Sequence, residues 1–174
     1  MTFWEYLTRA LLVLALAAAP CHAATDAGEH KLANGLRVII KPDRRAPVVV
    51  VLVSYQVGGI DEVNGVTGVA HVLEHMMFKG TPTVPAGEYS RLIAEAGGRE
   101  NAFTSQDFTG YFAMLQKSQL ELALRLEADR MTNITLAAEE FAKEIKVVME
   151  ERRWRTDDRP RSLVYEQLMA TGVH

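Results

Sequence analysis

GVTGVAHVLEHMMFKGT, residues 65–81, contains two histidines and a glutamate in the order H-x-x-E-H. In a helix His71 and His75 lie four positions apart, and therefore about 40° apart on one face. Glu74 projects roughly 60° to the other side of His71, within reach of water bound to the same ion. The opposite face is apolar, with Val69, Val72, Leu73 and Met76. The spacing predicts a helix that presents a metal-binding face and buries the other, in the inverse order of the H-E-x-x-H zinc helix.

A third ligand is needed before the two histidines imply a metal site. Zinc sites use three or four protein ligands, and without one the histidines are simply solvated. AAEEFAKEIKVVMEERRWR (137–155) predicts a long helix with Thr135 as its N-cap. Glu144 and Glu151, seven positions apart, share a face to within about 20°. That face also carries Phe141, Val147 and Val148.

Two carboxylates on an apolar face require a positive partner. One candidate is a zinc ion ligated by Glu151, with Glu144 in support. The other is pairing at the surface with a nearby basic residue: Arg152, Arg153 or Lys143. The spacing leaves these two interpretations equally open. Glu150 is a rival ligand, although it points about 120° away from Glu144.

The order of these residues resembles that of the pitrilysin/insulinase family of zinc metallopeptidases. Glu151 follows His75 by 76 positions, and the chain is most similar to the branch that contains the mitochondrial processing peptidase and its bacterial relatives. The resemblance covers roughly residues 28–174. Further stretches that agree are NGLRVII (34–40), AGGRENAFTSQDFTGYF (96–112) and RPRSLVYEQLMA (159–170).

The resemblance implies a role for each matching position. His71, His75 and Glu151 match the family's three ligands of one zinc ion, and Glu74 matches its general base. Glu144 matches the acidic residue that supports the site from behind the ligands. The family lays its substrate along the strand that corresponds to Asn101, Ala102 and Phe103. Glu100, just before that motif, departs from the family pattern.

The implied activity is that of a zinc-dependent endopeptidase acting on peptides or small unfolded proteins. Zinc held by two imidazoles and a carboxylate activates water, and Glu74 would take its proton and return it to the departing amine. The alternative is a non-catalytic, peptide-binding partner subunit of a peptidase complex. A structural zinc domain would instead need a fourth protein ligand. Family members usually carry a second, homologous domain, so we interpret residues 24–174 as an incomplete N-terminal zinc-binding domain.

Residues 1–23 predict a secretory signal peptide. Ten apolar residues, Ala10–Ala19, are too few to span a bilayer, and Cys21-His22-Ala23 resembles a cleavage site. The expected location is therefore periplasmic or secreted, with no stable membrane span in the mature chain. Lipoprotein anchoring at Cys21 is the alternative, disfavoured by Pro20 before it.

Charge argues weakly against a nucleic-acid partner. The formal net charge is −3, and no basic patch is interleaved with aromatic residues. One group of arginines is best explained as a solvated helix end: Arg152, Arg153, Arg155, Arg159 and Arg161.

The remaining pattern predicts an α+β fold, an antiparallel sheet with helices packed on one face. Asn34-Gly35 indicates a hairpin, and VVVVLVSYQV (48–57) is apolar enough for a central strand. A short helix is expected over 88–96, and Ser118-x-x-Glu121 predicts a capping box for a helix running to about Thr132.

Residues 101–105 and 109–115 predict a second antiparallel strand pair. If the strand over 101–105 lies at an edge, it can accept an extended peptide as one more strand. If it is paired on both sides, it cannot, and the residues alone leave both arrangements open.

Overall fold

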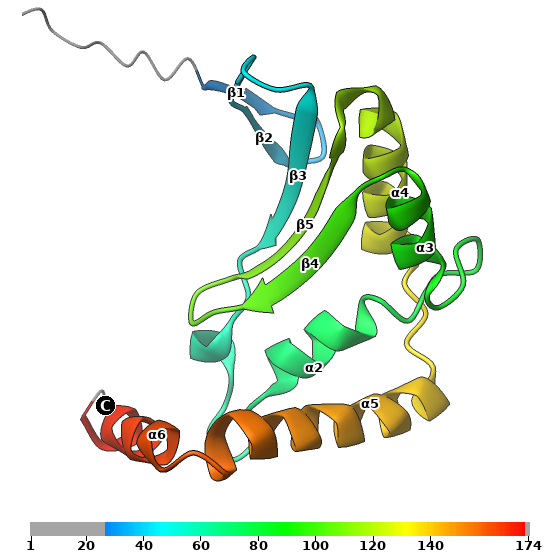
Figure 1. The fold of residues 1–174 in the computed structure, drawn as a ribbon. Helices are drawn as coiled ribbons and strands as arrows, with labels where there is room; N and C mark the ends of the chain where they lie inside the picture. The colour runs from blue at the N-terminus through cyan, green and yellow to red at the C-terminus, as the bar shows by residue number, and fades with distance from the viewer. Residues whose placement is uncertain (1–26, 173–174) are drawn as a thin grey trace, which may run out of the picture. The chain divides into compact units, whose positions relative to one another are not determined.

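The computed structural model describes residues 27–172, which form two compact units that divide between Ala46 and Pro47 (Figure 1). The expected signal peptide and Cys21 lie outside the described residues. Among residues 27–172, no helix combines the length and the apolar character needed to cross a membrane.

The first unit is a β-hairpin. Strands β1 (Gly28–Lys31) and β2 (Arg37–Ile40) pair antiparallel, from Gly28 opposite Ile40 to Lys31 opposite Arg37. The turn uses Gly35 at φ +90°, and Asn34 accepts the backbone N–H of Leu36 at 3.1 Å. The hairpin predicted from Asn34-Gly35 is confirmed, because glycine adopts this left-handed conformation without steric cost.

The second unit contains an antiparallel sheet of three strands in the order β3-β5-β4. These are β3 (Val48–Tyr55), β4 (Arg99–Thr104) and β5 (Thr109–Gln116). The strand pair predicted on either side of Gln106-Asp107 is confirmed. The central position predicted for β3 is wrong: β5 is central among the described strands, and every second residue of β3 is exposed. The continuous valine run therefore has one half-buried and one exposed face.

Helices α3 (Glu88–Glu95) and α4 (Leu120–Asn133) contribute to a core on one face of this sheet. The core consists of Tyr89, Ile93, Ala113, Leu115, Ala123 and Leu126. This confirms the α+β class with helices on one face. The capping box predicted at Ser118 is wrong, since a 3₁₀ turn, η2 (Lys117–Gln119), occupies that position and Gln119 precedes α4.

Below the sheet in Figure 1, α2 (Val69–Met76) packs against α5 (Ala138–Arg152). A 3₁₀ turn, η1 (Gly59–Asp61), precedes α2. A π-helical turn, η3 (Arg153–Asp157), follows α5 and leads to α6 (Pro160–Gly172). The N-cap predicted at Thr135 is wrong: α5 begins after Ala137, and the Thr135 backbone N–H instead bonds the Gly80 carbonyl at 2.9 Å.

The apolar face predicted for α2 is only half correct. Val72 and Met76 are buried, whereas Val69 and Leu73 are exposed. The helix is therefore covered along a narrower stripe than its sequence indicates.

Candidate metal centre

The N-terminus of α2 is anchored by a carboxylate outside the helix. Glu62 accepts the backbone N–H groups of Gly68, at 2.7 Å, and of Ala70, at 2.8 Å. Gly68 enters the helix at φ +90°, so no side chain at that position caps it. A negative charge here satisfies unpaired donors and complements the helix dipole. Sequence reasoning did not identify Glu62, which lies six residues before the N-cap Gly68.

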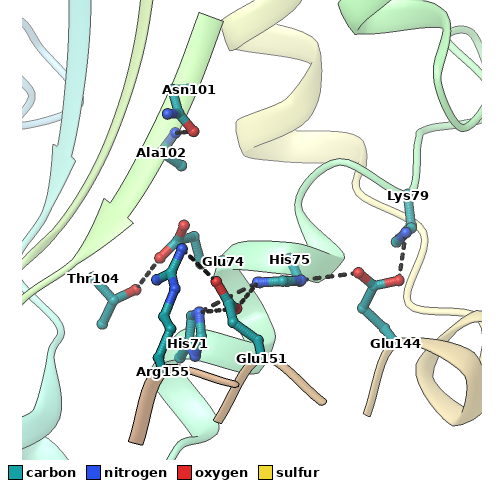
Figure 2. Close-up of polar contacts among 10 residues, drawn as sticks. All are labelled: His71, Glu74, His75, Lys79, Asn101, Ala102, Thr104, Glu144, Glu151 and Arg155. Atoms are coloured by element: carbon teal, nitrogen blue, oxygen red, sulfur yellow. Dashed lines mark hydrogen bonds and ion pairs between the residues drawn. The ribbon is translucent and has the colours of Figure 1, made fainter. Parts of the chain in front are cut away.

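Helices α2 and α5 bring three predicted ligands together (Figure 2). The Nε2 atoms of His71 and His75 are 3.2 Å apart, and Glu151 Oε2 lies 3.3 Å from the first and 3.4 Å from the second. Glu151 Oε2 is buried and has no hydrogen-bond partner among the described residues. A buried carboxylate oxygen without a partner is costly, so something positive is expected beside it.

The three donor atoms fit a zinc ion. A point equidistant from them lies about 1.9 Å from each, close to the roughly 2.0–2.1 Å of zinc–ligand bonds to nitrogen and oxygen. The same three residues form a cluster of potential ligand atoms within 4.8 Å of one another. Three protein donors leave a fourth coordination position for water, as catalytic zinc sites do.

Glu144 contacts His75 through Nδ1, the ring nitrogen that does not face His71. It accepts the Nδ1–H of His75 at 2.9 Å and an N–H of the Lys79 ammonium at 2.5 Å. Burial alone would raise the pKa of the Glu144 carboxyl, but these two partners outweigh it and leave the pKa below its ordinary value. A carboxylate at Nδ1 requires the proton there, which leaves the Nε2 lone pair for a metal. The residues alone did not point to Lys79, although it lies one turn beyond His75.

Arg155 provides the positive partner that Glu151 needs on its outer side. Its Nη2 lies 2.6 Å from Glu151 Oε1, so Oε2 alone faces the histidines. The arginines and lysine considered from the sequence bind elsewhere: Arg152 pairs with Glu166, Arg153 with Glu150, and Lys143 with Glu140. Glu150 therefore pairs with Arg153 and not with the cluster. Arg155, which the sequence placed in a solvated helix end, instead forms an ion pair with the predicted ligand Glu151.

Glu74 lies beside the cluster and is held by the sheet. The Thr104 hydroxyl of β4 donates to Glu74 Oε2 at 2.5 Å. Thr104 in turn lies 3.3 Å from the Thr109 hydroxyl, which donates to the Val57 carbonyl. The sequence gave no sign of this contact, because it joins residues 30 positions apart.

Strand β4 carries the three residues predicted to hold substrate, and it lies at an edge of the described sheet. Ala102 and Asn101 line an open hollow of about 300 Å³ that also borders Glu74 and His75. Asn101 and Phe103 alternate with Ala102 and are exposed, and the Phe103 ring packs against Phe108 and does not line the hollow. The structure thus places Ala102 and Asn101 near the metal donors and Phe103 away from them.

Comparison with known proteins gives the family. The sequence pattern of the insulinase family, peptidase family M16, matches residues 37–174. The chain belongs to this family. Its M16 relatives include the zinc protease PqqE of Helicobacter pylori, which is 38% identical over 165 residues, covering 92% of this chain and 37% of the relative. An uncharacterized zinc protease of Bacillus subtilis, YmxG, is 34% identical over 135 residues, covering 78% and 33%.

Solved M16 structures share the fold. A protease from Helicobacter pylori superimposes with a TM-score of 0.79 at 41% identity, covering 81% of this chain and 34% of that one. The first half of the periplasmic protease PqqL from Escherichia coli gives 0.69 at 30% identity, covering 74% and 29%. The chain spans about a third of the length of these M16 relatives.

Proposed function

We propose that this M16 chain is the metal-binding part of a zinc-dependent endopeptidase that cleaves peptides or small unfolded proteins. The observation that carries the proposal is the convergence of His71, His75 and Glu151 on one point, with a buried, unpartnered oxygen among them. One Zn²⁺ per chain would satisfy that oxygen. The naming of the relatives as zinc proteases supports both the metal and the reaction.

In the proposed reaction, Glu74 is the general base. Bound zinc would supply an acidified water and polarise the scissile carbonyl. Glu74 takes the proton from the attacking water and passes it to the departing amine. The hydrogen bond from Thr104 to Oε2 fixes the carboxylate and leaves Oε1 for that proton. Glu144 holds His75 in the tautomer that a metal ligand requires.

The proposed substrate site is the edge of β4. A peptide in extended conformation would pair with the backbone of Asn101, Ala102 and Phe103 as an added strand. Support comes from the position of β4, whose one partner among the described strands is β5. The hollow next to Ala102 gives room for substrate side chains beside Glu74.

The setting of the activity is also a proposal. We expect a second homologous domain or subunit to complete the substrate chamber, in line with the description of one similar structure as the first half of PqqL. We expect a cleaved signal peptide over residues 1–23 and a periplasmic or secreted location. PqqL is itself described as a periplasmic protease, which agrees with that location.

Replacing the proposed base tests the proposal. Glu74→Gln in the full chain should keep zinc and lose about 10²- to 10⁴-fold in the rate of peptide hydrolysis, the range expected for a general base. The measurement is zinc content by atomic emission beside cleavage of a quenched fluorescent peptide. Glu150→Gln, an exposed carboxylate on the same helix as Glu151, is the matched control and should change neither. Cleavage by Glu74→Gln at the original rate would refute the assignment of the base. A zinc-loaded chain that binds peptides but cleaves none would favour the non-catalytic subunit.

A further inference from the structure

Glu100 lies on the wall of the hollow that borders Glu74, and the proposed mechanism gives it no role. It is half-buried on β4, two positions before Ala102. Alternation along the strand puts Glu100, Ala102 and Thr104 on the same face, the face toward the core and the metal donors. The side chain is therefore held at the hollow by the strand itself.

The carboxylates that line the hollow differ in whether a basic residue pairs with them. Glu144 is neutralised by Lys79, at 2.5 Å. Glu100 receives a hydrogen bond from the Ser90 hydroxyl, at 2.8 Å, and forms no ion pair with any basic group of the described chain. A hydroxyl orients a carboxylate without cancelling its charge. Glu100 thus presents a fixed negative charge to whatever enters the hollow.

Glu100 lies on the same strand as Thr104, the residue that holds the proposed base Glu74. Thr104, which holds Glu74, lies four residues further along the strand, or about 13 Å at roughly 3.3 Å per residue. A peptide paired with the edge of β4 turns every second side chain toward the hollow. A long side chain within a few residues of the cleaved bond can therefore reach Glu100.

We propose that Glu100 makes this hollow a subsite for a basic side chain, lysine or arginine, of the bound peptide. The inference rests on the proposed binding of peptides along β4 and adds the chemical class of the substrate. A cation paired with a half-buried carboxylate is favoured more than at an open surface, because surrounding protein excludes part of the water. An acidic side chain at the same place meets like charge, so the subsite discriminates by repulsion as well as attraction.

Peptide binding to the full, zinc-loaded chain carrying Glu74→Gln tests the subsite without turnover. The probes are fluorescently labelled ten-residue peptides of neutral sequence, identical except for one position that is Lys, Gln or Glu, with that position moved along the series. Anisotropy titration should give Lys an affinity about three- to tenfold above Gln at one position, and Glu a lower affinity than Gln.

The decisive comparison adds a second substitution to that protein. Glu100→Gln should reduce the preference for Lys over Gln to about one, and Glu100→Lys should reverse it toward Glu. Glu95→Gln removes an exposed carboxylate from α3 that pairs with Arg91, and it is the matched control that should retain the preference. Peptides that bind without preference, or a preference that survives Glu100→Gln, would overturn the proposal. If selective binding is found but the chain with Glu74 intact cleaves none of the peptides, the proposed peptidase activity fails and the subsite stands.

Discussion

The contact between Glu144 and Nδ1 of His75 leaves Nε2 as the ring nitrogen available to the proposed metal. Because the carboxylate accepts the Nδ1–H and is itself neutralised by Lys79, the imidazole is held with its Nε2 lone pair toward His71 and Glu151. Partners of this kind are costly to lose, since they set both the tautomer and the orientation of the ligand. In the proposed site, the metal affinity of the cluster would therefore depend on a residue that contacts His75 and not the ion.

Replacing this carboxylate should weaken zinc binding. Glu144→Gln removes the charge that fixes His75 and Lys79, and we expect the zinc dissociation constant to rise by about 10- to 100-fold. Competition with a chromophoric chelator measures it. Glu140→Gln, a change of the same type one turn earlier on α5, should leave the constant unaltered. An unchanged constant in Glu144→Gln would show that His75 needs no support.

The sequence predicted some residues of the candidate site and not others. Spacing on two helices predicted that His71 and His75 share a face and that Glu144 and Glu151 share another, and the structure brings these faces together. The ion pair between Arg155 and Glu151 could have been predicted, because residues four apart in a helix are neighbours on its surface. Thr104 was not, because its contact with Glu74 depends on how the sheet meets α2.

At the scale of elements, the start of α2 depends on Glu62. Its carboxylate replaces the missing side-chain cap by accepting two backbone N–H groups of the first turn. Hydrogen bonds to a charged group contribute more than neutral ones. The anchor sets where the helix begins, and so where His71 falls on its surface.

Removing this anchor should cost stability. Glu62→Ala should lower the free energy of unfolding by about 1–2 kcal/mol, the range for loss of an N-cap. Urea denaturation followed by circular dichroism measures the change. Glu150→Ala, at an exposed position, should stay within about 0.5 kcal/mol of the parent chain. Equal stability of the two variants would mean that Glu62 does not hold the helix.

Elements were predicted better than their ends. The hairpin at Asn34-Gly35 followed from local turn chemistry, which acts over a few residues. The strand pair over 101–105 and 109–115 followed from the residue pattern of the strands themselves. Capping signals at Ser118 and Thr135 failed because the chain uses both places for other contacts, a 3₁₀ turn and a bond to Gly80. The edge position of β3 depends on strand order, which a run of valines does not encode.

At the scale of the second unit as a whole, a buried ion pair joins the helices to the sheet. Arg130 and Glu127 of α4 are each 3% exposed and are bonded at 2.7 Å through both carboxylate oxygens. The guanidinium lies over the rings of Phe78, Tyr89 and Tyr111 at 4.5–5.0 Å. Tyr89 donates to Glu127, and burial together with that charge raises the pKa of its hydroxyl, which stays protonated.

Breaking this pair on one side should destabilise the unit strongly. Arg130→Met leaves Glu127 buried without its cation and should cost about 3–5 kcal/mol of unfolding free energy. The double variant Glu127→Gln/Arg130→Met should recover part of the loss, because no buried charge remains. Arg125→Met, at an exposed position of α4, is the control for loss of one arginine. A single variant as stable as this control in thermal or urea unfolding would contradict the account.

The fold class was predictable at this scale because several sequence blocks resemble one family in the same order, and the match to peptidase family M16 confirms it. The hairpin was predictable from its local turn residues. Strand order and the contacts of α2 were not, since they depend on packing between segments distant in sequence.

The central claim is that this chain assembles one three-ligand zinc site. The most direct test is the zinc content of the purified full chain beside a His71→Ala variant, with circular dichroism to verify that both are folded. The account predicts about one zinc per parent chain and little in the variant, because two donors hold zinc far less tightly than three. A folded parent chain without zinc, or equal zinc in both proteins, would contradict it.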